Sequence, residues 1–278
     1  MPIRVLDCTL REGLYAVNPA SMDTESIINS LCAAGVDIIE RGKLQDGSSS
    51  ADMYKHLEAL RYTNSACALM FDYGKFNENK LPSCKEKGSI IRISFYKKNL
   101  EEVSFSAEKV KSKGYKVFMQ PSNIPEYSEA EILRLCKRAN SVGADAVYIV
   151  DSFGSMFPED LDRIMPVFKE TVDDNVEIGF HSHNSIQLSF ALSIKFIRNM
   201  SRNIIVDSSL CGIGRGAGNT KTELLLEYLN RHGCNYDTHI IWDCINNNIL
   251  PLYKIGNWEY TPQRGLKGIK GIHPGRAE

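Results

Sequence analysis

An alternation of short apolar runs with longer amphipathic stretches dominates this chain and constrains its fold more than any other feature. Several of the short runs, such as Val147–Val150, are continuously apolar, which is typical of strands buried on both faces. We predict eight strands, over Ile3–Leu10, Val36–Arg41, Ala66–Phe71, Ile90–Tyr96, Lys116–Gln120, Ala146–Asp151, Val176–His183 and Asn203–Leu210.

Stretches with helical periodicity follow these strands. The predicted helices are Asp23–Ala34, Ala51–Arg61, Leu100–Lys113, Ser128–Val142, Pro158–Thr171, Ile186–Met200 and Thr220–Arg231. Ser128 with Glu131 predicts a capping box, and Pro158 suits a first helical turn. The connection 72–88 is polar, contains Pro82 and predicts only a short helix.

Strand–helix units repeated in this way predict an α/β fold. Eight units in about 230 residues favour a (β/α)8 TIM barrel, and a doubly wound open sheet is the alternative. We place the barrel at residues 1–236 and a C-terminal extension of helical and irregular structure at 237–278. Within the extension, Thr238–Leu250 predicts one more helix.

Composition excludes several classes of protein. The formal net charge of −1 over 278 residues gives no reason to expect nucleic acid or an anionic membrane as a partner. No apolar run approaches the ~20 residues that cross a bilayer, and no signal peptide is evident. The eight cysteines form no CxxC pair. We therefore expect a protein of the reducing cytoplasm.

If the fold is a barrel, its chemistry should lie where the strands end. His181 and His183 close the seventh strand, and residues two apart on a strand project from one face. Two neighbouring imidazoles can bind one divalent cation, although the same spacing also arises by chance. Other strand ends carry further polar groups: Arg11, Glu12, Glu40, Gln120, Asp151, Ser152 and, after a Gly-rich loop, Asn219.

Each of these residues also has an ordinary structural explanation. Arg11 and Glu12 could form a surface ion pair, Glu40 could pair with Arg41 or Lys43, and Asp151 could cap a turn. The loop 212–219 could hold a phosphate at the start of a helix, but it has neither GxGxxG spacing nor a P-loop lysine. Their convergence on one barrel mouth favours a joint active site.

Three motifs resemble one known family. Asp7-Cys8-Thr9-Leu10-Arg11-Glu12-Gly13, His181-Ser182-His183-Asn184 and Gly214-Arg215-Gly216-Ala217-Gly218-Asn219 occur in the order seen in the pyruvate carboxyltransferase-type metal-dependent aldolases related to 3-hydroxy-3-methylglutaryl-CoA lyase. The resemblance covers residues 3 to about 231. Val150-Asp151-Ser152-Phe153-Gly154 is most similar to 4-hydroxy-2-oxovalerate aldolase-like proteins.

The resemblance implies roles by position. Glu12, which replaces the aspartate of most members, would bind a metal with His181 and His183, and Asn219 would add an oxygen ligand. Arg11 would face the developing enolate oxygen, and Ser152 the substrate carboxylate. Glu40, Gln120 and Asp151 are expected to bind substrate, as strand-end residues. Oxygen ligands favour Mn²⁺ or Mg²⁺, whereas the two histidines also suit Zn²⁺ or Co²⁺.

Two departures from the family pattern qualify these roles. A histidine base of the aldolases, or a glutamine of the synthases, is replaced by Tyr15, whose phenol is a weak base near neutrality. Tyr15 is therefore expected either to act as a shifted catalytic group or to bind the aldehyde. Cys211 precedes the glycines of a shorter loop than that of the lyase branch, and we interpret it as packing.

We therefore expect a divalent-metal-dependent carbon–carbon lyase that acts on a pyruvate-like 2-oxo acid and an aldehyde; a homodimer is one possible assembly. The alternative is a Claisen-type synthase that joins an acyl-CoA to a 2-oxo acid, as homocitrate and isopropylmalate synthases do. Glu12 favours it, whereas Leu14-Tyr15 and the lack of a recognisable regulatory domain oppose it. A degenerate barrel that only binds ligands is the non-enzymatic alternative.

Overall fold

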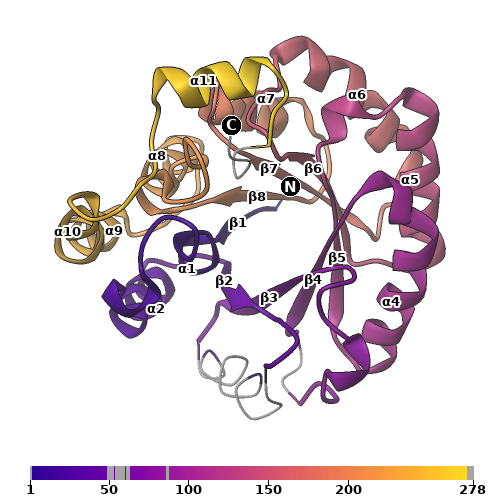
Figure 1. The fold of residues 1–278 in the computed structure, drawn as a ribbon, viewed down its shortest axis with the longest axis horizontal. Coiled ribbons are helices and arrows are strands. Elements are labelled where there is room, and N and C mark those ends of the chain that lie inside the picture. Colours follow the sequence, from indigo (N-terminus) through magenta and orange to yellow (C-terminus); the bar gives the residue numbers. More distant parts are fainter. Residues whose placement is uncertain (1, 49–52, 54–59, 61–62, 86–87, 274–278) are drawn as a thin grey trace.

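Eight parallel strands close into a barrel at the centre of the molecule (Figure 1). The computed structural model describes residues 2–48, 53, 60, 63–85 and 88–273. The strands are β1 (Ile3–Asp7), β2 (Ile38–Lys43), β3 (Ala66–Asp72), β4 (Ile90–Phe95), β5 (Lys116–Pro121), β6 (Ala146–Asp151), β7 (Glu177–Ser182) and β8 (Ile204–Ser208). They follow sequence order, and β8 pairs with β1, so the predicted TIM barrel is confirmed.

Helices surround the barrel and extend beyond it. They are α1 (Thr9–Gly13), α2 (Thr24–Ala33), α4 (Leu100–Ser112), α5 (Glu129–Ser141), α6 (Pro158–Thr171), α7 (Ser189–Asn199), α8 (Thr222–Asn230), α9 (Thr238–Cys244), the π-helical η6 (Ile245–Ile249), α10 (Leu250–Tyr253) and α11 (Pro262–Ile269). The Ser128–Glu131 capping box and the first-turn position of Pro158 are confirmed. The connection after β3 carries the short 3₁₀ helix η2 (Glu78–Lys80). The predicted helix 51–61 lies outside the described residues, apart from 53 and 60.

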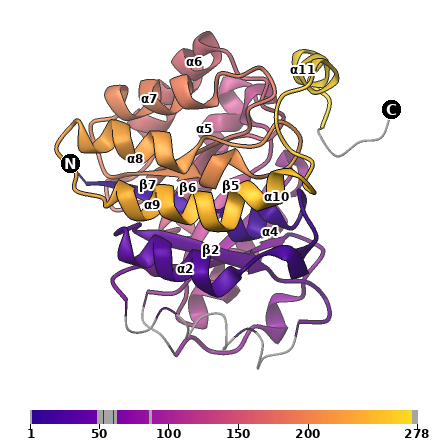
Figure 2. The same cartoon turned by 90° about the vertical axis from the view of Figure 1, so that its left-hand side faces the viewer.

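The segment after the barrel has two parts. The helix predicted over Thr238–Leu250 is present as α9 followed by η6, and α9 contacts both α2 and α8 (Figure 2). Helix α11 instead lies near the mouth, where Gly268 is close to the side chain of Ser185. No helix among the described residues is long and apolar enough to cross a membrane.

Alternation along each strand divides its side chains between two cores. One side of the strands packs against the helices, and the other fills the barrel with a smaller apolar cluster. The interior cluster consists of Leu6, Cys8, Ile38, Ala68, Ile90, Phe118, Ala146, Tyr148, Val150 and Ile205. Polar residues two positions further along several strands, such as Arg92, His181 and Asp207, therefore point inward nearer the mouth.

A β-bulge in β2 changes this alternation. The pairing of β2 with β3 shifts between Glu40 and Gly42, so that Lys43 lies opposite Met70 while Glu40 lies opposite Ala68. Regular alternation would turn Glu40 and Lys43 to opposite faces. The extra residue instead puts both on the barrel interior, as bulges at barrel rims commonly do.

Two predicted elements differ from the structure by three residues at one end, more than the other elements do. The first strand stops at Asp7 rather than Leu10, because the Asp7 carboxylate accepts the backbone N–H of Thr9 at 2.9 Å and the chain turns into α1. Helix α7 starts at Ser189 rather than Ile186, because Gln187 has a positive φ of 62°. Both corrections lie at the mouth, where polar turns replace regular structure.

Candidate metal centre

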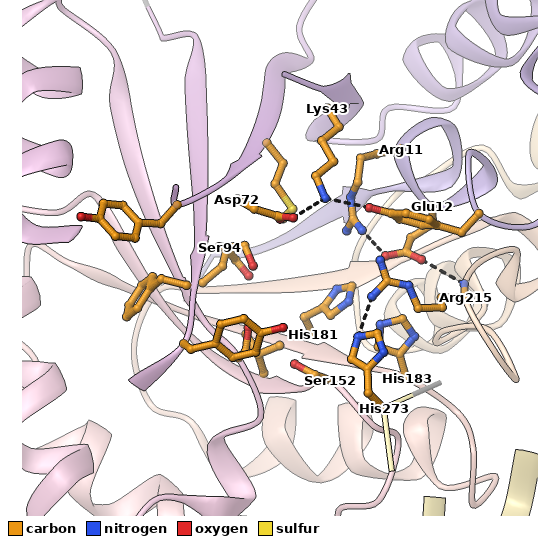
Figure 3. A pocket seen from close by; sticks show the side chains of 18 of the residues that line it. Arg11, Glu12, Lys43, Asp72, Ser94, Ser152, His181, His183, Arg215 and His273 are labelled. Carbon is orange, nitrogen blue, oxygen red and sulfur yellow. Dashed lines mark hydrogen bonds and ion pairs between the residues drawn. The ribbon is translucent and has the colours of Figure 1, made fainter. Parts of the chain in front are cut away.

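Three side chains from distant parts of the sequence meet at the carboxyl end of the barrel (Figure 3). Glu12 comes from α1, His181 from β7, and His183 directly follows β7. Each offers a ligand atom, these atoms lie within 4.8 Å of one another, and all three residues are buried. The imidazole rings stand nearly perpendicular, at 83°, with centroids 5.2 Å apart. This arrangement can close around a single cation.

Buried ion pairs surround the three residues and connect them. Arg11 pairs with Glu12 and donates from Nε to Glu40 at 2.8 Å, while Arg92 pairs with Glu40 and with Asp207. Asp207 in turn lies 2.9 Å from Nδ1 of His181. If Nδ1 carries the proton, Nε2 of His181 is left as the atom able to ligate. The network therefore fixes the ring orientation of one ligand.

The donor set fits a divalent cation. The network contains two arginines and three carboxylates, which leaves one excess negative charge in a buried volume. Nδ1 of His183 and Oδ1 of Asn219 are buried without a hydrogen-bond partner in the described part of the chain. Unpartnered buried polar atoms are costly, and a cation would satisfy both atoms.

The protonation states also suit metal binding. Burial disfavours the charged form of Glu12, but Arg11 and the two histidines outweigh burial and hold its pKa well below the usual range. Burial lowers the pKa of His183 to about 3, although Glu12 opposes this effect. A carboxylate and a neutral imidazole are therefore present near neutrality, which are the forms that bind metals.

A cavity of about 460 Å³ opens over these groups. Of the predicted site residues, Arg11, Glu12, Tyr15, Gln120, Ser152, His181 and His183 line it. The hydroxyl of Tyr15 accepts a hydrogen bond from Nζ of Lys43 at 2.9 Å. Predicted site residues that are as far apart in the sequence as Arg11 and His183 therefore line a single cavity.

Three predicted residues lie behind the cavity wall. Glu40 is fully buried in the ion-pair network. Asp151 accepts the backbone N–H groups of Ser155 and Met156, at 2.9 and 3.2 Å, so it secures the turn after β6. Asn219 faces His183 through an isolated antiparallel bridge and donates from Nδ2 to the Ile213 carbonyl at 3.1 Å. Substrate binding by Glu40 or Asp151 stays a prediction, as does ligation by Asn219.

Sequence reasoning missed several residues of this site. Lys43, Arg215 and His273 line the cavity, while Arg92 and Asp207 lie in the network below it. Strand alternation could have identified Arg92 and Asp207, since each follows an inward apolar residue by two positions. The bulge hid the orientation of Lys43, and no local pattern signals that the segment after α11 returns to the mouth.

Cys211 does not line this cavity, in agreement with its interpretation as a packing residue. It is buried, and its carbonyl accepts the indole N–H of Trp258 at 3.3 Å. Burial raises the pKa of the Cys211 thiol to about 12, so it is protonated and a poor nucleophile at neutral pH.

Similarity to known proteins agrees with this geometry. Residues 91–246, more than half of the chain, match the family model described as HMGL-like. A 4-hydroxy-2-oxovalerate aldolase of Geobacillus genomosp. 3 is 32% identical over 247 residues, which cover 83% of this chain and 71% of that protein. The chain belongs to the HMGL-like family. The resemblance predicted from the three motifs is therefore confirmed.

Other members are similar over nearly the whole of this HMGL-like chain. An oxaloacetate decarboxylase of Mycobacterium tuberculosis is 28% identical over 285 residues, covering 96% of this chain and 83% of that protein. The crystal structure of the N-terminal domain of a putative aldolase from Bacteroides vulgatus superposes with a TM-score of 0.79 at 25% identity, covering 98% and 94% of the two chains. The barrel fold is thus shared with a solved structure over nearly the whole chain.

Proposed function

We propose that this protein is a divalent-metal-dependent lyase that makes or cleaves a carbon–carbon bond through the enolate of a pyruvate-type 2-oxo acid, as a 4-hydroxy-2-oxovalerate aldolase does. The observation that carries the proposal is the meeting of Glu12, His181 and His183 beside the Arg11 guanidinium. The similarity to 4-hydroxy-2-oxovalerate aldolases supports it.

Glu12, His181 and His183 would hold the metal, with Asn219 as a further oxygen donor. When bound, a divalent ion would polarise the keto group of the 2-oxo acid and so favour loss of a C3 substituent or proton. We favour Mn²⁺ or Mg²⁺ for a site that gains oxygen ligands from substrate, and Zn²⁺ or Co²⁺ also suit the two histidines.

The protein's own groups would orient the substrate and stabilise charge. Arg11 lines the cavity and is held by Glu40 and Glu12, so its guanidinium is fixed before substrate arrives. A fixed cation beside the keto oxygen stabilises negative charge that develops only in the transition state. Gln120 and Ser152 supply neutral polar groups on the cavity wall, suited to the substrate carboxylate.

Tyr15 would hold the oxygen of the aldehyde. Its hydroxyl oxygen accepts a hydrogen bond from Lys43 Nζ, so its own hydrogen is free to turn toward the cavity. Lys43 is itself paired with Asp72 at 2.7 Å. Burial opposes protonation of Lys43, but the hydrogen bonds to Asp72 and Tyr15 prevail and raise its pKa. Lys43 would therefore stay a donor throughout the reaction.

A second candidate is decarboxylation of a 2-oxo dicarboxylic acid such as oxaloacetate. This reaction yields the same enolate but needs no base to remove a hydroxyl proton, and Tyr15 replaces the histidine that would serve as that base. The similarity to the oxaloacetate decarboxylase of M. tuberculosis supports it. The Claisen-type synthase is favoured only by Glu12 and ranks third.

Exchange of the pyruvate methyl protons in D₂O tests enolate formation without knowledge of the partner. We expect Mn²⁺-dependent exchange, detected by NMR, that His181→Ala abolishes together with metal binding. Arg11→Lys should keep the metal but slow the exchange by about 100-fold, because the lysine ammonium lacks the paired, coplanar N–H donors of the guanidinium. Exchange in His181→Ala, exchange at the wild-type rate in Arg11→Lys, or no exchange in the metal-loaded wild-type protein would refute the proposal.

Product assays then separate the three reactions. The protein with Mn²⁺ is supplied with pyruvate plus propanal, with oxaloacetate, or with acetyl-CoA plus a 2-oxo acid. An aldol product supports the first candidate, and pyruvate formed from oxaloacetate above the rate of free Mn²⁺ supports the second. Release of free CoA thiol would favour the synthase instead.

A further inference from the structure

One arginine of the cavity, Arg215, is held without a carboxylate partner. Its guanidinium lies over the ring of Tyr15, with Cζ 4.1 Å from the ring centroid. Its Nη1 lies 2.8 Å from Nε2 of His273 (Figure 3). No carboxylate of the described residues forms an ion pair with this guanidinium. A planar cation supported by two rings is pre-oriented, and its remaining N–H groups are available.

The other cations of the cavity differ in this respect. Arg11 is neutralised by Glu12 and Glu40, and Lys43 and Lys75 share Asp72. The cavity is lined by four cationic side chains and only two carboxylates. Arg215 is therefore the cation of this cavity that no side-chain carboxylate of the described residues pairs.

Arg215 is placed close to the metal centre by the backbone of its loop. Its own N–H donates to Oε2 of Glu12 at 3.1 Å. A Cβ on the preceding Gly214 would collide with Nδ2 of Asn219 and lie 2.8 Å from Oε2 of Glu12, so the loop presses directly against the ligand groups. Arg215 and the three candidate metal ligands therefore line one cavity.

His273 supports the guanidinium from the C-terminal segment. Its ring meets Phe153 edge-on, with centroids 5.7 Å apart, and Phe153 also lines the cavity. Helix α11, which precedes His273, is seated near Ser185 and Gly154. The segment that follows the barrel thus contributes to the wall of the cavity.

We propose that Arg215, supported by Tyr15 and His273, is an anion subsite for the second reactant, so that the partner of the 2-oxo acid carries a carboxylate or a phosphate group. The substrate assignment rests on the proposed function, whereas the anion subsite itself does not. Guanidinium groups recognise both anions through paired N–H donors, and desolvated contacts of this kind dominate specificity.

Direct binding tests the subsite without turnover. The full chain, treated with EDTA so that no metal can bind the probe, is titrated calorimetrically with succinate, with inorganic phosphate and with uncharged succinamide. We expect one or both anions to bind and succinamide not to bind, with the tighter anion identifying the group that is recognised. Arg215→Gln should weaken anion binding by about 10- to 100-fold. The matched control Arg198→Gln, an exposed arginine of α7, should not.

Anion binding that is absent from the wild-type protein, or equal in Arg215→Gln, would overturn the subsite. Arg215→Lys, which keeps the charge but loses the fork, should show an intermediate loss if binding uses paired donors. His273→Ala tests whether His273 positions Arg215. The charge of Arg215 stays in this variant, so the anion affinity should fall by less than in Arg215→Gln. An unchanged affinity in His273→Ala would remove that residue from the proposal.

Kinetics with Mn²⁺ test the substrate class. The wild-type protein should condense pyruvate with succinic semialdehyde or glyceraldehyde 3-phosphate at a higher kcat/KM than with propanal. Arg215→Gln should bring the ratio of anionic to neutral aldehyde close to one, mainly by raising KM for the anionic aldehyde. An unchanged ratio, or a wild-type preference for propanal, would overturn the assignment. Absence of pyruvate methyl exchange in the wild-type protein would instead refute the proposed function, and calorimetry would still decide the subsite.

Discussion

The orientation of His181 depends on a residue that never reaches the cavity. Asp207 is buried, lies 2.9 Å from His181 Nδ1 and is also paired with Arg92. Burial opposes its charge, but Arg92 and His181 prevail and hold the pKa of Asp207 below its usual value. A carboxylate behind a ligating histidine fixes the tautomer and increases the basicity of the ligand.

Asp207→Asn should therefore weaken metal binding without removing a ligand. We expect the Mn²⁺ dissociation constant, measured by calorimetry, to rise by about 10- to 100-fold. The control is Asp145→Asn, since Asp145 is also ion-paired, to Lys111, but lies at the opposite end of the barrel. Unchanged affinity in Asp207→Asn, or an equal loss in both variants, would show that the contact does not orient His181.

The site residues that the motifs predicted are positioned by local sequence, whereas the missed ones are positioned by tertiary structure. Arg11, Glu12, His181 and His183 belong to short segments whose geometry is set by one strand end each. Lys43 required a bulge, and His273 required a helix that docks on another part of the mouth. Such tertiary placements leave no periodic signal in a single sequence.

At the scale of elements, the turn after β6 holds the ligand-bearing end of β7. Gly154 has a φ of +63°, its carbonyl accepts the Ile186 N–H at 3.1 Å, and His183 N–H donates to the Asp151 carbonyl at 3.1 Å. A Cβ at Gly154 would collide with the backbone nitrogen of Ser185 and lie 2.9 Å from the carbonyl carbon of His183. The close approach of these two turns therefore requires glycine.

Gly154→Ala should affect both stability and metal binding. Strain at positive φ costs about 1 kcal/mol, and the backbone collision adds to it by displacing His183. We expect a larger loss of unfolding free energy in urea than in Gly233→Ala, whose φ is +96° with open space around it, and a weaker Mn²⁺ affinity only at Gly154. Equal effects in the two variants would contradict the coupling of this turn to the metal centre.

Element type was easier to predict than element ends. All eight strands were identified, because apolar runs in a parallel barrel are buried on both faces. The predicted element ends near the barrel mouth were wrong where hydrogen bonds to side chains replace the backbone pairing of the strands. Asp7 ends β1 by binding the Thr9 N–H, and Thr9 Oγ1 accepts the N–H of Leu210, so the first strand turns into α1 three residues early.

For the molecule as a whole, closure of the barrel joins the first strand to the last strand–helix unit. Cys8 N–H donates to the Ser208 carbonyl at 2.8 Å, and Oδ2 of Asp7 accepts the Thr222 hydroxyl at 2.6 Å. Burial raises the pKa of Asp7 to about 6, despite hydrogen bonds from Thr222 and Thr9 that lower it. The contact between the first strand and the last strand–helix unit therefore contains a carboxyl group that is costly to ionise.

This cost predicts a pH dependence of stability. The native state binds a proton at Asp7 more tightly than the unfolded state does, so the contribution of Asp7 to stability falls as pH rises from about 4 through about 6. Between pH 5 and 7 the unfolding free energy of the wild-type protein should decline by about 1 kcal/mol relative to Asp7→Asn. Urea unfolding of both proteins in EDTA measures this difference. Parallel pH profiles would contradict it.

The central claim is that Glu12, His181 and His183 share one divalent cation. The most direct measurement is an anomalous difference map from a crystal of the full chain soaked with Mn²⁺ and oxalate, an analogue of the pyruvate enolate. We predict a single strong peak about 2.2 Å from a Glu12 oxygen and from one nitrogen of each histidine. A map with no peak among these three side chains, at Mn²⁺ concentrations that support turnover, would contradict the account.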